Sequence, residues 1–221
     1  MATPIGNLED ITYRAVRTLR EADLVICEDS RRGGMLLKHL GISKPLRTYH
    51  DHTPEFKEDS LVRELKDGAH AALITDGGTP AISDPGFGLI RKCIDSGIRI
   101  EGIPGPSALV NALATSGLAL HTFTFMGYLP RKKGAREKVL QSLAQEERTL
   151  VFYESPHRLV AALAQMLRIL GDREASFSRE MTKKFEETLR GKLSELSGRM
   201  NAGNIRGEWT LVVAGAGCGS S

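Results

Sequence analysis

The sequence lacks several features that would place it in a membrane or a secreted compartment. It contains no apolar run of about eighteen residues, the length that a spanning helix needs, and no signal-peptide pattern. Only three cysteines occur, Cys27, Cys93 and Cys218, and they lie far apart. Their spacing provides neither a disulfide framework nor a zinc site. These absences favour a cytoplasmic protein with no bound metal and no membrane contact.

A strong excess of one charge is also missing. Thirty Lys and Arg residues oppose 27 Asp and Glu residues, which leaves a net charge of +3 and says little about nucleic acid. Locally, however, five basic residues crowd into eight positions: Arg131, Lys132, Lys133, Arg136 and Lys138. Such a cluster either contacts phosphate groups or forms a solvated linker, and the sequence alone leaves both interpretations open.

A Gly- and Pro-rich loop is the most informative feature that is present. The apolar run 71–74 predicts a buried strand, and it leads directly into Thr75–Gly88. Gly77 and Gly78 permit positive φ and a close approach of the backbone to a ligand. The alternative is a hairpin turn at Asp76-Gly77. The helix-like stretch that follows Gly86 favours a ligand loop instead.

Two further loops of this kind occur in the first half of the chain. Residues 98–103 are rich in β-branched side chains and predict a strand, followed by Pro104-Gly105-Pro106 and by Ser107 as a helix cap. The third loop, Thr3–Asn7, precedes another amphipathic helix. If their strands are parallel, the three loops converge on the C-terminal edge of one sheet, where ligands bind in open α/β folds.

Strands and helices alternate through the first half, which predicts an α/β domain with a mostly parallel sheet and helices on both faces. The pattern breaks near 126–134, so we place a boundary there, with an N-terminal domain of residues 1–125 and a C-terminal domain of residues 126–221. The second domain is predicted to be mixed α+β. Its expected strands are Thr149–Tyr153, Ala175–Ser178, a short one at Thr188–Leu189, and Trp209–Val213.

Seven sequence blocks resemble, in order and spacing, the ribosomal small subunit methyltransferase I family of the tetrapyrrole-methylase superfamily. They cover nearly the whole chain and comprise residues 3–8, 28–31, 76–86, 103–108, 127–130, 153–158 and 179–183. Family members have more apolar residues before the first block than Met1 and Ala2, and a helical C-terminal extension. Either the sequence begins late or this central first strand is short.

The resemblance implies a two-domain tetrapyrrole-methylase-like fold, a homodimer, and S-adenosylmethionine as methyl donor. The implied reaction is 2′-O-methylation of a cytidine in the decoding region of 16S ribosomal RNA, with the small ribosomal subunit as partner. Two alternatives remain. One is a methyltransferase that acts on a tetrapyrrole or another small acceptor, and the other is a non-catalytic module that binds the donor. The basic cluster and the blocks 28–31 and 153–158 favour RNA.

The resemblance also implies which residues contact the donor. Loops of Gly and Pro expose backbone carbonyls, which suit the polarised methyl group of a sulfonium. The implied donor-contacting residues are Ile5, Gly6, Gly77, Gly78, Thr79, Ile82, Ser107, Ala108 and Tyr153. Each of them could instead serve a turn or a helix cap.

The acceptor side requires a base, or a cation that stabilises a developing alkoxide, because a ribose hydroxyl is a poor nucleophile. One group of candidates follows the strand at 24–27 and comprises Glu28, Asp29 and Arg31. The other group, in the second domain, comprises Glu180 and Lys183. His157 fits helix-start packing as well as catalysis. The run His50-Asp51-His52 alternates faces on an extended segment, so it favours RNA contact over metal binding.

Overall fold

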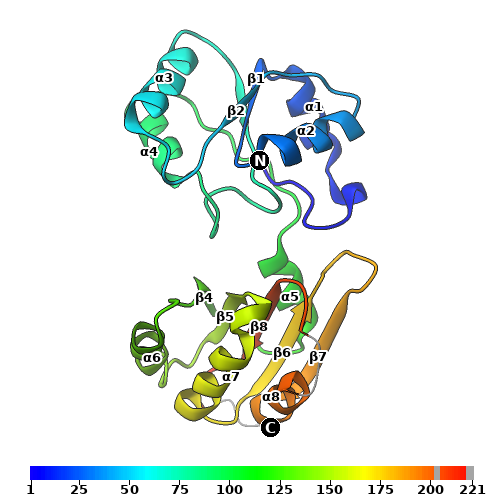
Figure 1. Cartoon of the computed structure of the whole chain (residues 1–221), viewed down its shortest axis with the longest axis vertical. Coiled ribbons are helices and arrows are strands. Elements are labelled where there is room, and N and C mark those ends of the chain that lie inside the picture. The colour runs from blue at the N-terminus through cyan, green and yellow to red at the C-terminus, as the bar shows by residue number, and fades with distance from the viewer. Residues whose placement is uncertain (202–204, 218–221) are drawn as a thin grey trace. The chain divides into compact units, whose positions relative to one another are not determined.

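The computed structural model describes residues 1–201 and 205–217 and divides the chain into two compact units, Met1–Ser107 and Ala108–Ser221 (Figure 1). Cys218 lies outside the described residues. In the part of the chain that is described, no helix is both long and apolar enough to cross a membrane.

The first unit is built on a three-stranded parallel sheet. β1 (Leu24–Cys27) lies in the centre, between β2 (Leu46–Thr48) and β3 (Ala71–Leu73). Ile26 is in register with Arg47 on one side and with Leu73 on the other. The predicted parallel sheet is confirmed. The hairpin alternative at Asp76-Gly77 is wrong, because β3 pairs with β1 and its loop leads to a helix.

Helices cover both faces of this sheet, as the alternation of its side chains requires. Val25 and Cys27 pack into a hydrophobic cluster with α1 and α2, whereas Leu24 and Ile26 pack into another with α3 and α4. The prediction of helices on both faces is confirmed. The helices are η1 (Leu8–Asp10), α1 (Tyr13–Glu21), α2 (Ser30–His39), α3 (Glu55–Lys66) and α4 (Phe87–Asp95).

The predicted strand at 98–103 is wrong, because this segment has no strand assignment. Its backbone bonds lie at its ends: Ile98 N–H donates to the Cys93 carbonyl of α4 at 2.9 Å, and the Ile103 carbonyl accepts from Ala2 N–H at 3.1 Å. A β-branched sequence becomes a strand only where a neighbouring backbone supplies a ladder. Ile100 is accordingly 47% exposed.

The second unit contains a five-stranded mixed sheet with the order β4-β5-β8-β6-β7. β4 and β5 are parallel, and the other neighbours are antiparallel. The predicted mixed α+β architecture is therefore confirmed. The strands are β4 (Phe123–Tyr128), β5 (Thr149–Glu154), β6 (Glu174–Arg179), β7 (Glu187–Lys192) and β8 (Trp209–Val213).

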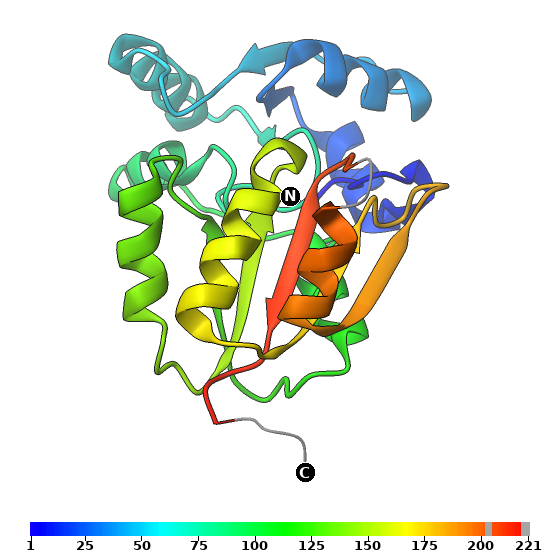
Figure 2. The ribbon, with the colours of Figure 1, turned by 60° about the horizontal axis from the view of Figure 1, so that its bottom comes forward.

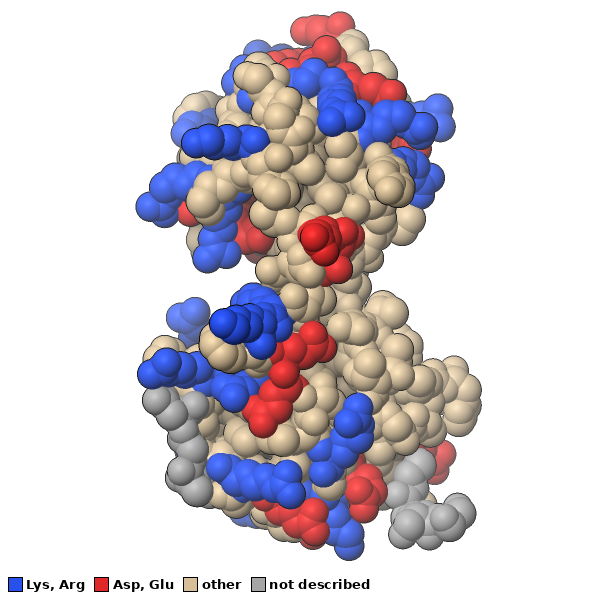
Figure 3. Space-filling model, turned by 90° about the vertical axis from the view of Figure 1, so that its right-hand side faces the viewer, with Lys and Arg blue, Asp and Glu red and all other residues tan. Residues whose placement is uncertain are grey.

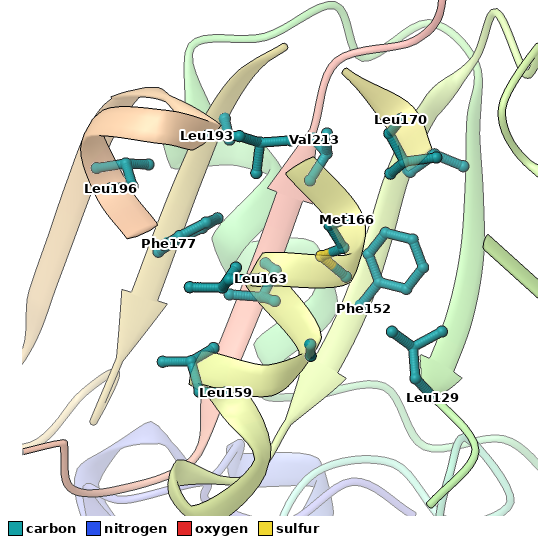
Figure 4. Close-up of a cluster of buried hydrophobic side chains, with 14 of the residues drawn as sticks. Leu129, Phe152, Leu159, Leu163, Met166, Leu170, Phe177, Leu193, Leu196 and Val213 are labelled. Atoms are coloured by element: carbon teal, nitrogen blue, oxygen red, sulfur yellow. The ribbon is translucent and has the colours of Figure 1, made fainter. Parts of the chain in front are cut away.

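One face of this sheet carries α6 (Lys133–Ser142), α7 (Pro156–Leu170) and α8 (Leu193–Asn201), which lie side by side in Figure 2. Their shared core places α7 side chains such as Leu163 and Met166 over Phe152 and Phe177 of the strands (Figure 4). All four of these side chains are fully buried. This core fixes β5, which carries Tyr153 near its C-terminal end, and β6, which leads to Glu180 and Lys183.

The division between the units falls at Ser107/Ala108, earlier in the chain than the boundary predicted near residue 126. Helix α5 (Ala108–Ser116) packs on β8 and β6, and β4 pairs with β5, so both elements belong to the second sheet. Sequence periodicity cannot reveal that α5 packs on the second sheet. Both α4 and α5 follow a Gly- and Pro-rich loop, so their local sequence patterns look alike.

Candidate active site

The three Gly- and Pro-rich loops of the first unit meet through backbone hydrogen bonds. Thr3 and Gly78 form a bridge in which each N–H donates to the other carbonyl at 2.9 Å. Thr3 Oγ1 also donates to the Thr75 carbonyl at 3.2 Å. Ala2 N–H donates to the Ile103 carbonyl, directly before the loop Pro104-Gly105-Pro106. The loops therefore meet as predicted, but not as three loops at the edge of one sheet, because only Thr75–Gly88 follows one of its strands and residues 98–103 form none.

Gly77 and Gly78 have structural reasons to be glycine. A Cβ on Gly77 would lie 3.0 Å from the Pro4 carbonyl oxygen, and Gly78 adopts a φ of +89° and is buried against Ile5. Both backbone polar groups of Gly78 are already used in its bridge to Thr3. These glycines therefore let two loops pack closely. Exposed Gly6, Thr79 and Ile82 are the accessible predicted contacts in this region.

Among the remaining predicted donor contacts, Ser107 is the last residue of the first unit. Ala108 and Tyr153 lie in the second unit. There, Leu109 N–H in the first turn of α5 donates to the Tyr153 hydroxyl at 3.1 Å, which brings Tyr153 to the residue next to Ala108. The Tyr153 ring packs edge-on against Phe125, with centroids 5.0 Å apart. Tyr153 is thus held in a fixed orientation at the C-terminal end of β5.

Asp29 and Arg31 form one local structure at the start of α2. The Asp29 carboxylate accepts the Arg31 backbone N–H at 2.8 Å and the Arg31 guanidinium at 2.9 Å. These bonds to Arg31 lower the pKa of Asp29 below its ordinary value. A carboxylate stabilised in its charged form is a weak base. Asp29 therefore suits the positioning of Arg31, whose side chain is 88% exposed and available to an anion.

The sequence analysis missed Asp84, a carboxylate in the loop Thr75–Gly88. Partial burial, and next the proximity of Glu28, raise the pKa of Asp84 to about 6, against the opposing effect of its bond from Thr75 Oγ1 at 3.4 Å. Burial likewise raises the pKa of Glu28. A carboxylate that titrates near neutrality is suited to accepting a proton. The one sequence signal that pointed to Asp84 was its position in the loop after β3.

Glu180 and Lys183 occur together in the loop between β6 and β7. Lys183 Nζ donates to Glu180 Oε1 at 3.0 Å, and the Lys183 N–H donates to the Glu180 carbonyl. Glu180 has a φ of +48° and lies so close to Gly207 that a Cβ there would clash with its carboxylate. The structure brings these two predicted residues together as an ion pair.

The basic cluster divides into exposed and buried members. Arg131, Lys132 and Lys133 are exposed, but Arg136 is 6% exposed and its Nε donates to Gln165 Oε1 inside α6 and α7. Both interpretations of the cluster, phosphate contact and solvated linker, require exposed side chains, so Arg136 does not belong to it. His157 is exposed in the first turn of α7.

Other candidate features carry no predicted site residue. Among residues 1–201 and 205–217, no group of three or more His, Cys, Asp or Glu side chains could hold a metal ion. A pocket of about 380 Å³ lies at the opposite edge of the second sheet from Tyr153, where Asp172, Arg173 and Lys192 line it. Asp172 there accepts from Ser194, and Arg173 donates to the carbonyls of Leu170, Ala144 and Ala214.

Comparison with known proteins identifies the fold and the family. Residues 2–197 match the model of the Tetrapyrrole (Corrin/Porphyrin) Methylases. A uroporphyrin-III C-methyltransferase from Thermus thermophilus, solved with S-adenosylhomocysteine, shares the fold with a TM-score of 0.64 and 22% identity, covering 95% of this chain and 93% of its own. A diphthine synthase superposes with a TM-score of 0.69 and 15% identity, covering 96% and 87%. The chain is a member of the tetrapyrrole methylase family.

Curated relatives define the family more narrowly. The ribosomal RNA small subunit methyltransferase I of Halalkalibacterium halodurans is 48% identical over 217 residues, 98% of this chain and 75% of its own length. The protein of the same name from Thermotoga maritima is 45% identical over 215 residues, 97% of this chain and 96% of its own. Within the tetrapyrrole methylases, the chain belongs to the ribosomal RNA small subunit methyltransferase I family.

Proposed function

We propose that this protein transfers a methyl group from S-adenosylmethionine to the 2′-hydroxyl of a cytidine in 16S ribosomal RNA, within the small ribosomal subunit. The observation that carries this proposal is the 45–48% identity to ribosomal RNA small subunit methyltransferases I across 97–98% of the chain. A cytoplasmic location and pairing into a homodimer belong to the same proposal, and light scattering tests the dimer.

The donor would be held by the converging loops. Gly6, Thr79 and Ile82 are accessible there, while Ile5, Gly77 and Gly78 fix the loop backbone on which those contacts depend. Ser107, Ala108 and Tyr153 complete the proposed set. S-adenosylmethionine supplies an electrophilic methyl group, and the task of the protein is to align it with the acceptor oxygen.

The acceptor requires proton removal and charge stabilisation. Asp84 has the pKa, about 6, that suits a proton acceptor. Arg31, oriented by Asp29, would bind a phosphate or stabilise developing negative charge. Glu180 and Lys183 provide a second acid and cation in the other unit. We propose these groups as the acceptor machinery.

The net charge of +3 is small, so RNA binding would depend on local groups rather than on a broad field. On the face shown in Figure 3, Lys and Arg side chains are interspersed with Asp and Glu. The exposed segment Arg131–Lys133 is a local exception, with three consecutive cations. Phosphate contacts from such a segment give salt-dependent affinity.

The direct test is methyl transfer from tritiated S-adenosylmethionine to small ribosomal subunits that lack the modification. The proposal expects label in 16S RNA, recovered after nuclease digestion as 2′-O-methylcytidine. A parallel reaction with a precorrin-type tetrapyrrole serves as the small-acceptor control. Label in the tetrapyrrole with unlabelled RNA would overturn the RNA assignment, whereas donor binding without label in either acceptor would indicate the non-catalytic module.

A further inference from the structure

An exposed aromatic ring occupies the loop between β6 and β7. Phe185 is 71% exposed, although a large apolar side chain is normally buried. In Figure 1 this loop projects beyond the ends of the neighbouring strands of its sheet. Met181, four residues earlier, is 7% exposed and anchors the loop in the unit. The exposed Phe185 side chain is therefore carried by a loop that the buried Met181 holds in place.

The loop that carries Phe185 is held by its own hydrogen bonds. Lys183 N–H donates to the Glu180 carbonyl at 3.0 Å, and Glu186 N–H donates to the Lys183 carbonyl at 3.0 Å. Thr182 N–H donates to the Glu186 carboxylate at 2.8 Å. These bonds span both sides of Phe185. The ring is thus displayed by an ordered turn, which lowers the entropy cost of binding a partner.

The charges of the hairpin leave one cation over one face of the ring, with the other face free of this cation. Each carboxylate already has a partner: Glu180 pairs with Lys183, Glu186 accepts from Thr182, and Glu187 pairs with Arg179 at 2.7 Å. Lys184 Nζ lies 5.7 Å from the centroid of the Phe185 ring. No acidic partner of Lys184 occurs among the described residues. The tip therefore combines a flat apolar face with a cation.

We propose that Phe185 is a stacking platform for an unpaired base of the RNA substrate, with Lys184 contacting the adjacent phosphate. An aromatic face accepts any nucleobase, and a neighbouring cation meets the backbone that links successive bases. The chemistry of the tip thus fits a single-stranded or looped RNA segment. The proposal rests on the proposed function, since it assigns a contact to the RNA acceptor.

The test measures binding of the full chain to a fluorescent single-stranded RNA of about a dozen nucleotides and to small ribosomal subunits. Phe185→Ala is expected to weaken RNA binding by roughly ten- to hundredfold. Phe185→Trp keeps a stacking face and is expected to retain affinity, with its indole fluorescence quenched when RNA binds. Phe56→Ala is the matched control, because Phe56 is 68% exposed on α3, and it is expected to bind as the wild type.

The outcomes separate this inference from the function beneath it. If the wild type methylates ribosomal RNA and Phe185→Ala binds RNA equally well, the stacking contact alone is overturned. If the wild type neither binds nor methylates ribosomal RNA, both the proposed function and the stacking contact are overturned. If Phe185→Ala instead dissociates a dimer in light scattering, the ring packs against a second copy and the RNA contact is overturned. Unchanged donor affinity in Phe185→Ala is expected throughout.

Discussion

Arg158 and Glu154 form an ion pair across the junction of β5 and α7, with Arg158 Nε 3.1 Å from Glu154 Oε1. The Glu154 side chain is fully buried, and it also accepts the Ser155 N–H at 2.9 Å. Arg158 in turn donates to the carbonyl of Leu129, the first residue of the loop from β4 to α6. The bond from Arg158 to Leu129 thus joins two sequence blocks that are far apart in the chain, 153–158 and 127–130.

Removing the cation of this pair should destabilise the protein strongly. Arg158→Ala leaves Glu154 buried without its partner, and we expect a loss of roughly 3–5 kcal/mol in the free energy of unfolding. Urea denaturation measures this loss. Arg168→Ala is the control, since the Arg168–Glu137 pair is more exposed, and it should cost at most about 1 kcal/mol. Equal effects of the two variants would contradict the structural role of Arg158.

Asp84 should make stability depend on pH. Burial and Glu28 raise its pKa from 3.8 to about 6, so the folded protein holds this proton more tightly than the unfolded chain does. Its contribution to stability is therefore full below about pH 4 and is lost as the pH rises through 6. Asp84→Asn should flatten the pH dependence of the free energy of unfolding and should gain stability, relative to the wild type, between pH 4 and 7.

The control for this prediction is Asp95→Asn, which removes a carboxylate from an exposed pair with Arg91 on α4. Urea denaturation of all three proteins at pH 4, 5, 6 and 7 makes the comparison. The Asp95 variant should follow the wild-type profile over this window. A wild-type profile in Asp84→Asn as well would show that Asp84 does not titrate there.

The loop packing at Gly77 should matter for both stability and donor binding. Gly77→Ala places a Cβ 3.0 Å from the Pro4 carbonyl oxygen and must push the two loops apart. We expect a loss of about 1 kcal/mol in the free energy of unfolding and weaker binding of S-adenosylhomocysteine in calorimetry. Gly102→Ala, where a Cβ would meet nothing within 4 Å, should leave both unchanged. Donor affinity that survives in Gly77→Ala would remove this loop contact from the site.

Sequence periodicity predicted the helices and strands whose formation depends on the residues within the element itself. Buried strands such as β1 and β8 stand out as β-branched runs, and Gly117 and Gly171 mark the ends of α5 and α7 with positive φ. The segment 98–103 has the same local pattern but no ladder, because strand formation depends on a partner from elsewhere. Local pattern also assigned α5 to the first domain, although its packing is on β8 and β6.

The candidate site was predictable in its loops and less so in its charges. Thr3 and Gly78 meet as the converging-loop argument requires. The raised pKa of Asp84 depends on burial and on Glu28, distant in the chain, and no spacing rule reveals it. Arg136 shows the converse. Its place in a basic run predicted exposure, but the helical turn of α6 directs it toward Gln165. Charge runs on helices must be divided by face before they are assigned to a ligand.

The exposed basic segment should determine the salt dependence of RNA binding. Replacing Arg131, Lys132 and Lys133 together with Ser removes three cations, so the slope of log affinity against log salt concentration should fall by about 2 for single-stranded RNA. Binding of S-adenosylhomocysteine should not change, because this ligand makes no phosphate contacts. Arg136 stays in place, since Arg136→Ser would leave Gln165 without its buried donor and would damage the fold.

The matched control removes three exposed basic residues of α3, Lys57, Arg63 and Lys66, which are not among the predicted contacts. Fluorescence titrations at several salt concentrations compare both triple variants with the wild type. A smaller slope in the first variant alone assigns phosphate contacts to Arg131–Lys133. Equal slopes in all three proteins would make this segment a solvated linker, because counterion release depends only on cations that lie against phosphate groups. RNA affinity would then have to come from cations elsewhere, with Arg31 and Lys184 the first to substitute.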